Sequence, residues 1–249
     1  TTDSNNNALI TCEKSKFNIA GKSGDDFSYL PAIIKDKMIT LSQFQLKEVI
    51  NQTIFSIAIN DNNKMMTGEL FEVNEGTLKV VGLDGHRIAI RNFKLEGRAD
   101  DVKVVVPGKT LQEISKILST DAENMVNVYF TNNHILFEFD NTTVVSRLIE
   151  GEYFKINQML SSDYGTKVVI NKKEFIDSID RANLLIKEGE KKPIIINITD
   201  GSLEVNVNSA SGTLNEGIDI EKEGKDLMIR FNPKFLLDAL RVIDDETVD

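Results

Sequence analysis

The chain has 249 residues, 41% of them apolar, and its 39 acidic and 29 basic residues give a net charge of −10. This length is enough for one large domain or two ordinary ones with a sizeable core. Apolar runs of only a few residues exclude a membrane span, a single cysteine (Cys12) excludes an internal disulfide framework and favours a cytoplasmic protein, and the acidic balance argues against binding to nucleic acid.

The first strongly periodic segment predicts an amphipathic helix over residues 41–58, with its apolar side chains at helical spacing: Leu46, Val49, Ile50, Thr53, Ile54 and Ile57. Alternating apolar and polar residues follow and predict strands of an antiparallel sheet with one buried face, as in ELFEV, TLKVV and RIAIR. A second helix is predicted over 107–118, because a proline near a helix start loses no intrahelical hydrogen bond.

The same elements recur later in the chain. LSQFQLKEVI (41–50) returns as INKKEFIDSI (170–179), FEVNEGTLKV as INITDGSLEV, and VVVPGKTLQEISKIL as MIRFNPKFLLDALRVI. These matches predict two further helices, over 171–188 and 232–243. Their order and nearly constant offset indicate a repeat of about 125 to 130 residues, which is the size of a domain.

The phase of the repeat predicts three stretches. Residues 1–35 match the end of a unit, residues 36–163 make a complete unit (the middle repeat), and residues 164–249 make a unit that stops part way through (the third repeat). We therefore expect a piece of a longer protein. Each unit reads helix, strands, helix, strands, which is an α+β fold of two helices packed on antiparallel sheets.

The segment VVGLDGHRIAIRN (80–92) holds one of only two histidines. Asp84-Gly85 between two alternating segments predicts a type I′ turn, which needs positive φ at both central positions. At the same place the third repeat has SGTL (211–214), which keeps a glycine but has neither histidine nor arginine. The fold is therefore expected to need the turn and not His86 or Arg87, which leaves those two residues for function.

Catalysis is the weaker interpretation of this turn. A histidine base needs a nucleophile, a metal or a polarised substrate within reach, and Cys12 belongs to a different unit. No motif with metal-ligand spacing and no cofactor motif occurs, so no metal and no cofactor is expected. A tandem-domain enzyme with His86 as general base stays an alternative, and a repeat scaffold with no role on DNA is a second one.

LDGHRIAIR (83–91) resembles the turn of the bacterial sliding-clamp family, the DNA polymerase III beta subunits, and SKFNIAGKSGDDFSYLP (15–31) is similar to the close of that family's first domain. The resemblance implies the DNA-clamp fold and a non-enzymatic processivity factor of the bacterial cytoplasm. It also implies a homodimeric ring around duplex DNA, with helices lining the hole. The implied partners are the DNA polymerase III alpha subunit, the clamp loader, and other polymerases and repair proteins.

The resemblance further implies an apolar pocket that receives short partner peptides. Carried over position by position, its walls would be Met66, Leu83, Gly85, His86, Arg87, Ile88, Phe154, Gln158 and Met159. Apolar side chains bury peptide anchors, whereas histidine and arginine supply orienting donors. Phe154 stands where the family often has proline and Gln158 where it often has arginine, so the pocket floor is expected to differ in shape. An ordinary core role is the alternative for Met66, Leu83 and Met159.

The ring also answers the objection from net charge. The four predicted helices carry nine basic and seven acidic residues, and basic pairs at i and i+7 recur in both repeats. A solvated helix face explains such pairs equally simply. The resemblance implies instead that they face the hole and contact phosphates without reading sequence. The DNA-facing set is Lys64, Lys109, Lys116, Lys234 and Arg241.

Leu184 and Leu185 match the apolar pair that the family uses on the third-domain side of its subunit interface. The resemblance implies that these two leucines meet the first domain of a neighbouring subunit. They are the expected dimer-interface residues.

Overall fold

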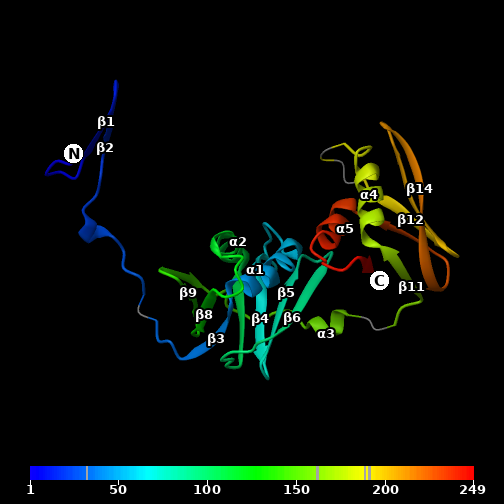
Figure 1. Cartoon of the computed structure of the whole chain (residues 1–249), viewed down its shortest axis with the longest axis horizontal. Coiled ribbons are helices and arrows are strands. Elements are labelled where there is room, and N and C mark those ends of the chain that lie inside the picture. Colours follow the sequence, from blue (N-terminus) through cyan, green and yellow to red (C-terminus); the bar gives the residue numbers. More distant parts are fainter. Residues whose placement is uncertain (32, 161–162, 188, 190–191) are drawn as a thin grey trace. The chain divides into compact units, whose positions relative to one another are not determined.

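The computed structural model describes residues 1–31, 33–160, 163–187, 189 and 192–249. Residues 161–162 near the predicted boundary at 163, and residue 188 at the predicted end of a helix, lie outside the described residues. The chain divides into two compact parts, Thr1–Ile34 and Lys35–Asp249. The first part holds an antiparallel hairpin of β1 (Ala8–Cys12) and β2 (Ser15–Ile19), followed by the short 3₁₀ turn η1 (Gly24–Asp26) (Figure 1).

The middle repeat contains two four-stranded antiparallel sheets and two α-helices. One sheet has the strand order β6-β5-β4-β7 and the other β10-β9-β8-β3. Helices α1 and α2 pack against each other, and α2 lies on β4 and β7 (Figure 1). The elements are β3 (Lys37–Ser42), α1 (Gln43–Asn51), η2 (Ile54–Ser56), η3 (Lys64–Thr67), β4 (Gly68–Asn74), β5 (Thr77–Leu83), β6 (Ile88–Lys94), β7 (Val102–Pro107), α2 (Gly108–Ile117), β8 (Met125–Phe130), β9 (His134–Phe139) and β10 (Thr142–Arg147).

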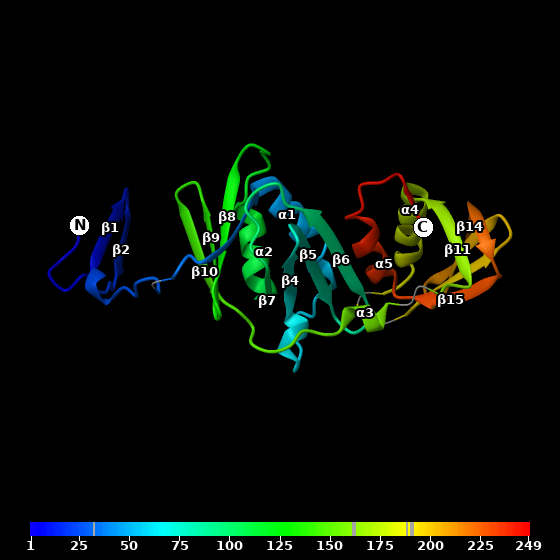
Figure 2. The same cartoon turned by 90° about the horizontal axis from the view of Figure 1, so that it is seen from below.

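The third repeat has one six-stranded antiparallel sheet, in the order β15-β12-β13-β14-β11-β16, with α4 and α5 packed against each other (Figure 2). Its first four strands correspond one by one to β7-β4-β5-β6, which confirms the predicted repeat of the fold. The elements, after the short α3 (Ile156–Met159), are β11 (Thr166–Asn171), α4 (Lys172–Asn183), β12 (Ile194–Thr199), β13 (Ser202–Ser209), β14 (Gly212–Gly224), β15 (Leu227–Phe231), α5 (Pro233–Leu240) and β16 (Thr247–Val248). Within the described part of the chain, none of these helices has the length and apolar character that crossing a membrane requires.

Helix α1 begins at a capping box, in which the Ser42 hydroxyl accepts from the Gln45 N–H and the Gln45 side chain accepts from the Ser42 N–H. The predicted helix over 41–58 is too long, since α1 ends at Asn51. The backbone leaves the helix at Thr53, whose φ is −126° and whose N–H donates to the Ile50 carbonyl oxygen three residues back, and the chain continues as η2. The predicted helix over 171–188 is too long as well, because α4 ends at Asn183.

Each repeat has its own apolar core. In the middle repeat α1 and α2 share one core with both sheets, and in β4 Phe71 and Val73 belong to it. The side chain of Leu70, just before Phe71, lies on the opposite face of the strand. There it joins a smaller cluster of Leu70, Val81, Leu83, Val105, Tyr153 and Ile156, which we call the sheet-face cluster. The core of the third repeat is separate.

One ionisable side chain is enclosed in the middle repeat. Glu69 in β4 is fully buried, and neither of its carboxylate oxygens has a hydrogen-bond partner within the described part of the chain. Thr53 is its neighbour, but the threonine hydroxyl donates to the helix backbone instead. Burial raises the pKa of Glu69 to about 8, because the interior disfavours the charged form.

Candidate partner-binding site and nucleic-acid interface

The turn between β5 and β6 differs in conformation from the prediction. The strands are paired up to Leu83 and Ile88, and positive φ occurs at Gly85 (82°) but not at Asp84. The central residues are therefore Gly85 and His86, with positive φ only at the first, which fits a type II′ and not a type I′ turn. The Asp84 carboxylate causes the shift, because it accepts hydrogen bonds from the backbone N–H groups of His86 (3.0 Å) and Arg87 (3.1 Å).

Arg87 joins the middle repeat to the third repeat. Its guanidinium donates to Asp84 Oδ2 at 3.1 Å and, from Nη1, to Asp238 Oδ2 in α5 at 2.8 Å. It also donates to the Phe55 carbonyl oxygen and lies over the rings of Phe55 and Phe235. Contrary to the expectation that the fold has no use for Arg87, this side chain makes a contact between the two repeats, beside a second one from Gln52 to Asp244 (3.2 Å).

Asp238 receives two cations. Lys234 Nζ lies 2.9 Å from the same carboxylate that Arg87 contacts. Burial acts to raise the pKa of Asp238, but the hydrogen bonds from Arg87 and Lys234 outweigh it and lower this pKa from its usual value. The two cations therefore favour the charged form of the Asp238 carboxylate, which holds the guanidinium in place.

Sequence reasoning missed the residues of α5 at this site. The imidazole of His86 lies 5.7 Å from the Phe235 ring, and Phe235 also packs on Arg87 at 4.4 Å. The only local signal was a lysine followed four residues later by an acid in both second helices, as in Lys234 and Asp238. That spacing marks an exposed helix face but carries no information about which turn packs on it.

The structure gathers part of the expected peptide pocket. Met66, Ile88 and Phe154 pack against the sheet-face cluster, which includes Leu83. Leu83 has an exposed fraction of 0%. Although it is the last residue of β5 before the turn, its side chain belongs to the core and not to the surface. Gln158 and Met159 lie exposed on α3, outside this cluster.

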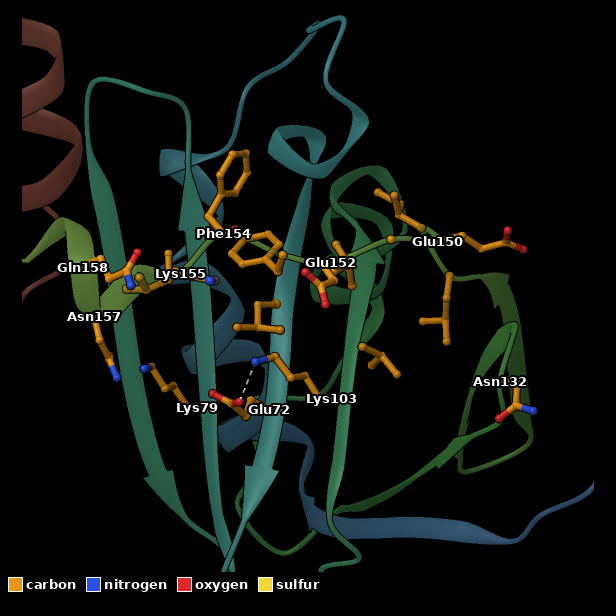
Figure 3. Close-up of a pocket in the computed structure, with 18 residues that line it drawn as sticks. Glu72, Lys79, Lys103, Asn132, Glu150, Glu152, Phe154, Lys155, Asn157 and Gln158 are labelled. Carbon is orange, nitrogen blue, oxygen red and sulfur yellow. Dashed lines mark ion pairs between the residues drawn. The ribbon is translucent and has the colours of Figure 1, made fainter.

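A cavity of about 720 Å³ lies beside these residues (Figure 3). One side is formed by β4, β5 and β7, and the other by residues 148–158, which we call the connector. The Glu72–Lys103 ion pair (3.0 Å) crosses the strands that form the first side. Of the expected pocket, only Phe154 and Gln158 line this connector cavity; its lining is Leu70, Glu72, Lys79, Lys103, Val104, Val105, Asn132, Leu148, Ile149, Glu150, Gly151, Glu152, Tyr153, Phe154, Lys155, Ile156, Asn157 and Gln158.

The expected DNA-facing cations are all exposed, but most are already paired. Lys116 Nζ lies 2.8 Å from Glu113, Lys234 contacts Asp238, and Arg241 contacts Asp180 at 2.9 Å. Within the described residues, Lys64 and Lys109 have no ion-pair partner. Because three of these five cations are paired with carboxylates, the predicted DNA-facing helices carry less free positive charge than their number of lysines and arginines indicates.

The expected interface leucines have different environments. Leu184 follows the last residue of α4 and is 83% exposed, whereas Leu185 packs against the core of the third repeat. Only Leu184 is therefore freely presented at the surface, because Leu185 already serves its own repeat. In the described residues no three His, Cys, Asp or Glu side chains cluster in a way that could hold a metal ion.

Comparison with known proteins gives the same family for both repeats. A sequence model of the central domain of the DNA polymerase III beta subunit matches residues 40–155, and one of its C-terminal domain matches residues 157–249. A crystal structure of a DNA polymerase III beta subunit from Eubacterium rectale is 67% identical, with a TM-score of 0.92 over 99% of this chain and 67% of that one. The sliding clamp of Bacillus subtilis is 33% identical, with a TM-score of 0.91 over 99% and 66%.

A beta sliding clamp of Staphylococcus aureus is 36% identical over 97% of this chain. The chain spans 64% of the length of that curated relative. Both matched domains, the shared strand order and the fold of the solved relatives agree, and the chain belongs to the DNA polymerase III beta subunit family of sliding clamps.

Proposed function

We propose that this chain is part of a non-enzymatic clamp that encircles duplex DNA and tethers polymerases, the clamp loader and repair proteins in the bacterial cytoplasm. The observation that carries the proposal is the pair of adjacent repeats with one strand order, each matched by a clamp domain. Repetition of one unit suits a ring, because equivalent helix pairs are presented at regular intervals. In the complete ring, two such subunits would close around the duplex.

Partner peptides would bind at the apolar surface around the turn. Met66, Ile88 and Phe154 are only partly buried and pack on a preformed cluster, so an anchor side chain can add to existing apolar contacts. The exposed His86 edges this surface and supplies an orienting donor. Leu83 would support the walls from inside.

The enzyme alternative has less support. The imidazole of His86 faces the Phe235 ring, and the free thiol Cys12 lies in the first compact part of the chain. A general base needs a reacting group within hydrogen-bond reach, and a phenyl ring offers none. The non-catalytic interpretation is therefore the one we put to the test.

Titration of a Gln-Leu-x-Leu-Phe-type peptide tests the tethering role. We expect saturable binding by fluorescence anisotropy, weakened about tenfold by Met66→Ala, since a buried anchor contact contributes more than about 1 kcal/mol. Met228→Ala is the matched control, because Met228 is an exposed methionine (67%) on β15. Absence of saturable binding by the folded chain, or equal loss in both variants, would contradict the proposed pocket.

A further inference from the structure

The connector cavity has a basic end without internal compensation. Lys79 projects from β5 and Lys155 precedes α3, and both lie at the end of the cavity where Asn157 and Gln158 are found (Figure 3). Within the described residues neither lysine has an ion-pair partner. Lys103, on the neighbouring strand, is instead neutralised by Glu72 at 3.0 Å. The free positive charge is therefore concentrated at the α3 end.

The remainder of the cavity changes from aromatic to acidic away from α3. Phe154 and then Glu152 lie along the connector beyond Lys155, and Glu150 lies at the end away from α3 (Figure 3). Tyr153 also belongs to the lining. The Tyr153 hydroxyl donates to the Val81 carbonyl oxygen at 3.0 Å, and the Ile149 N–H donates to the Val105 carbonyl oxygen at 2.9 Å. These bonds fix the connector on the sheet, so the cavity is formed before any ligand arrives.

The cavity also adjoins the apolar surface around the turn, since Phe154 packs against the sheet-face cluster beside Met66 and Ile88 and also lines the cavity. Three lysines and three glutamates line it, so a polyanion such as DNA gains no net attraction there. A ligand that places one carboxylate near Lys79 and Lys155, and an apolar group against Phe154, would complement this lining. An extended peptide segment with an acidic residue next to apolar residues has that pattern.

We propose that the connector cavity is a second peptide subsite, which binds residues flanking the anchor of a partner peptide and takes an acidic side chain between Lys79 and Lys155. The inference rests on the proposed tethering function and adds a specificity element to it. The anchor would supply most of the affinity, and the flank would rank one partner above another. Two partly exposed charge pairs correspond to a gain of about fivefold in affinity.

The test uses the anchor peptide extended by Asp-Asp or by Asn-Asn, at its N-terminus in one pair and at its C-terminus in another. We expect one of the two Asp-Asp peptides to bind about fivefold more tightly than its Asn-Asn counterpart at low salt. The Lys79→Gln/Lys155→Gln variant should abolish that difference and leave the affinity for the Asn-Asn peptide unchanged. High salt should reduce the gain in the unmodified chain.

Lys94→Gln/Lys225→Gln is the matched control. It removes the same charge from exposed lysines that do not line the cavity, with Lys94 on the same sheet. The control variant should keep the fivefold preference. Equal affinity for the Asp-Asp and Asn-Asn members of both pairs, or an equal loss of preference in the control variant, overturns the second subsite while the anchor site stands. Failure of every peptide to bind the folded chain overturns the tethering function and the subsite with it.

Discussion

Replacing Glu69 by glutamine should remove a pH dependence from the stability of this protein. The ordinary pKa of a glutamate is 4.5, and burial raises that of Glu69 to about 8. Between these values the folded chain keeps a proton that the unfolded chain releases. The stabilisation is therefore complete below pH 4.5, is lost as the pH rises toward 8, and is absent above it.

The magnitude follows from the interval chosen. Between pH 6 and pH 9, about two pH units lie below the raised pKa, and each is worth about 1.4 kcal/mol. The free energy of unfolding should therefore fall by about 3 kcal/mol over this range through Glu69 alone. Glutamine at this position has the shape of the protonated acid and does not titrate. The site therefore contributes no pH dependence to the free energy of unfolding of the Glu69→Gln variant over the same range.

Urea unfolding followed by far-ultraviolet circular dichroism at pH 6 and pH 9 measures the effect. The quantity of interest is the difference between Glu69→Gln and the unmodified chain at each pH, which cancels the titration of all other groups. Glu72→Gln is the control, because Glu72 lies on the same strand and is paired with Lys103 at the surface. If the Glu69→Gln and unmodified chains lose stability in parallel from pH 6 to pH 9, Glu69 is ionised in the fold and the reasoning is wrong.

Arg87→Ala should lower the free energy of unfolding by about 2 kcal/mol, the scale of losing a hydrogen bond between charged groups, while Asp238 keeps its contact with Lys234. In a double-mutant cycle with Asp238→Ala, urea unfolding should show that the double variant loses less stability than the sum of the two single losses. Additive losses would mean that Arg87 and Asp238 do not interact. Leu83→Ala should lower the free energy of unfolding by about 3 kcal/mol, as expected for truncation of a buried leucine. An unchanged melting temperature would contradict the burial of Leu83. Replacing Lys109 and Lys116 together by glutamine should reduce the slope of log affinity for DNA against log salt concentration by roughly one to two units. An unaltered slope in a filter-binding assay would show that this helix face does not contact DNA.

Local patterns were sufficient for the repeats and the helices. The apolar spacing of Leu46, Val49 and Ile50 specified the buried side of α1, because helical periodicity depends only on neighbours along the chain. The end of that helix was missed, since the apolar spacing continues through Ile54 and Ile57 while the backbone leaves the helix at Thr53. The turn conformation was missed because the Asp84 carboxylate accepts from the N–H groups of His86 and Arg87, which places Gly85 and not Asp84 at the first central position.

Contacts between distant segments were beyond the sequence patterns. No local pattern around Arg87 predicts its contact with Asp238, which is 151 residues away in the sequence. The burial of Glu69 is different: strand alternation places it on the face of Phe71 and Val73, but a glutamate at the start of a strand predicts exposure, and only the tertiary packing encloses it. Leu83 was assigned to the pocket wall from family position alone, whereas its burial depends on how the connector crosses the sheet.

Strand β14 gives the third repeat a longer mechanical continuity than the middle repeat has. Its first residues pair with β13, from Gly212 to Asp219, and its last with β11, from Ile220 to Gly224. The corresponding β6 lies at the edge of its own sheet. A load applied to β11 is therefore carried to β13 by the main-chain hydrogen bonds of one strand. In the middle repeat the corresponding link is much shorter: after β6 has ended, Ala99 bridges to Ile39 of β3, and the Thr40 N–H donates to the Arg98 carbonyl oxygen at 3.0 Å. Fewer main-chain hydrogen bonds carry the load there, so amide hydrogen exchange under tension should separate the two sheets of the middle repeat before the sheet of the third repeat opens.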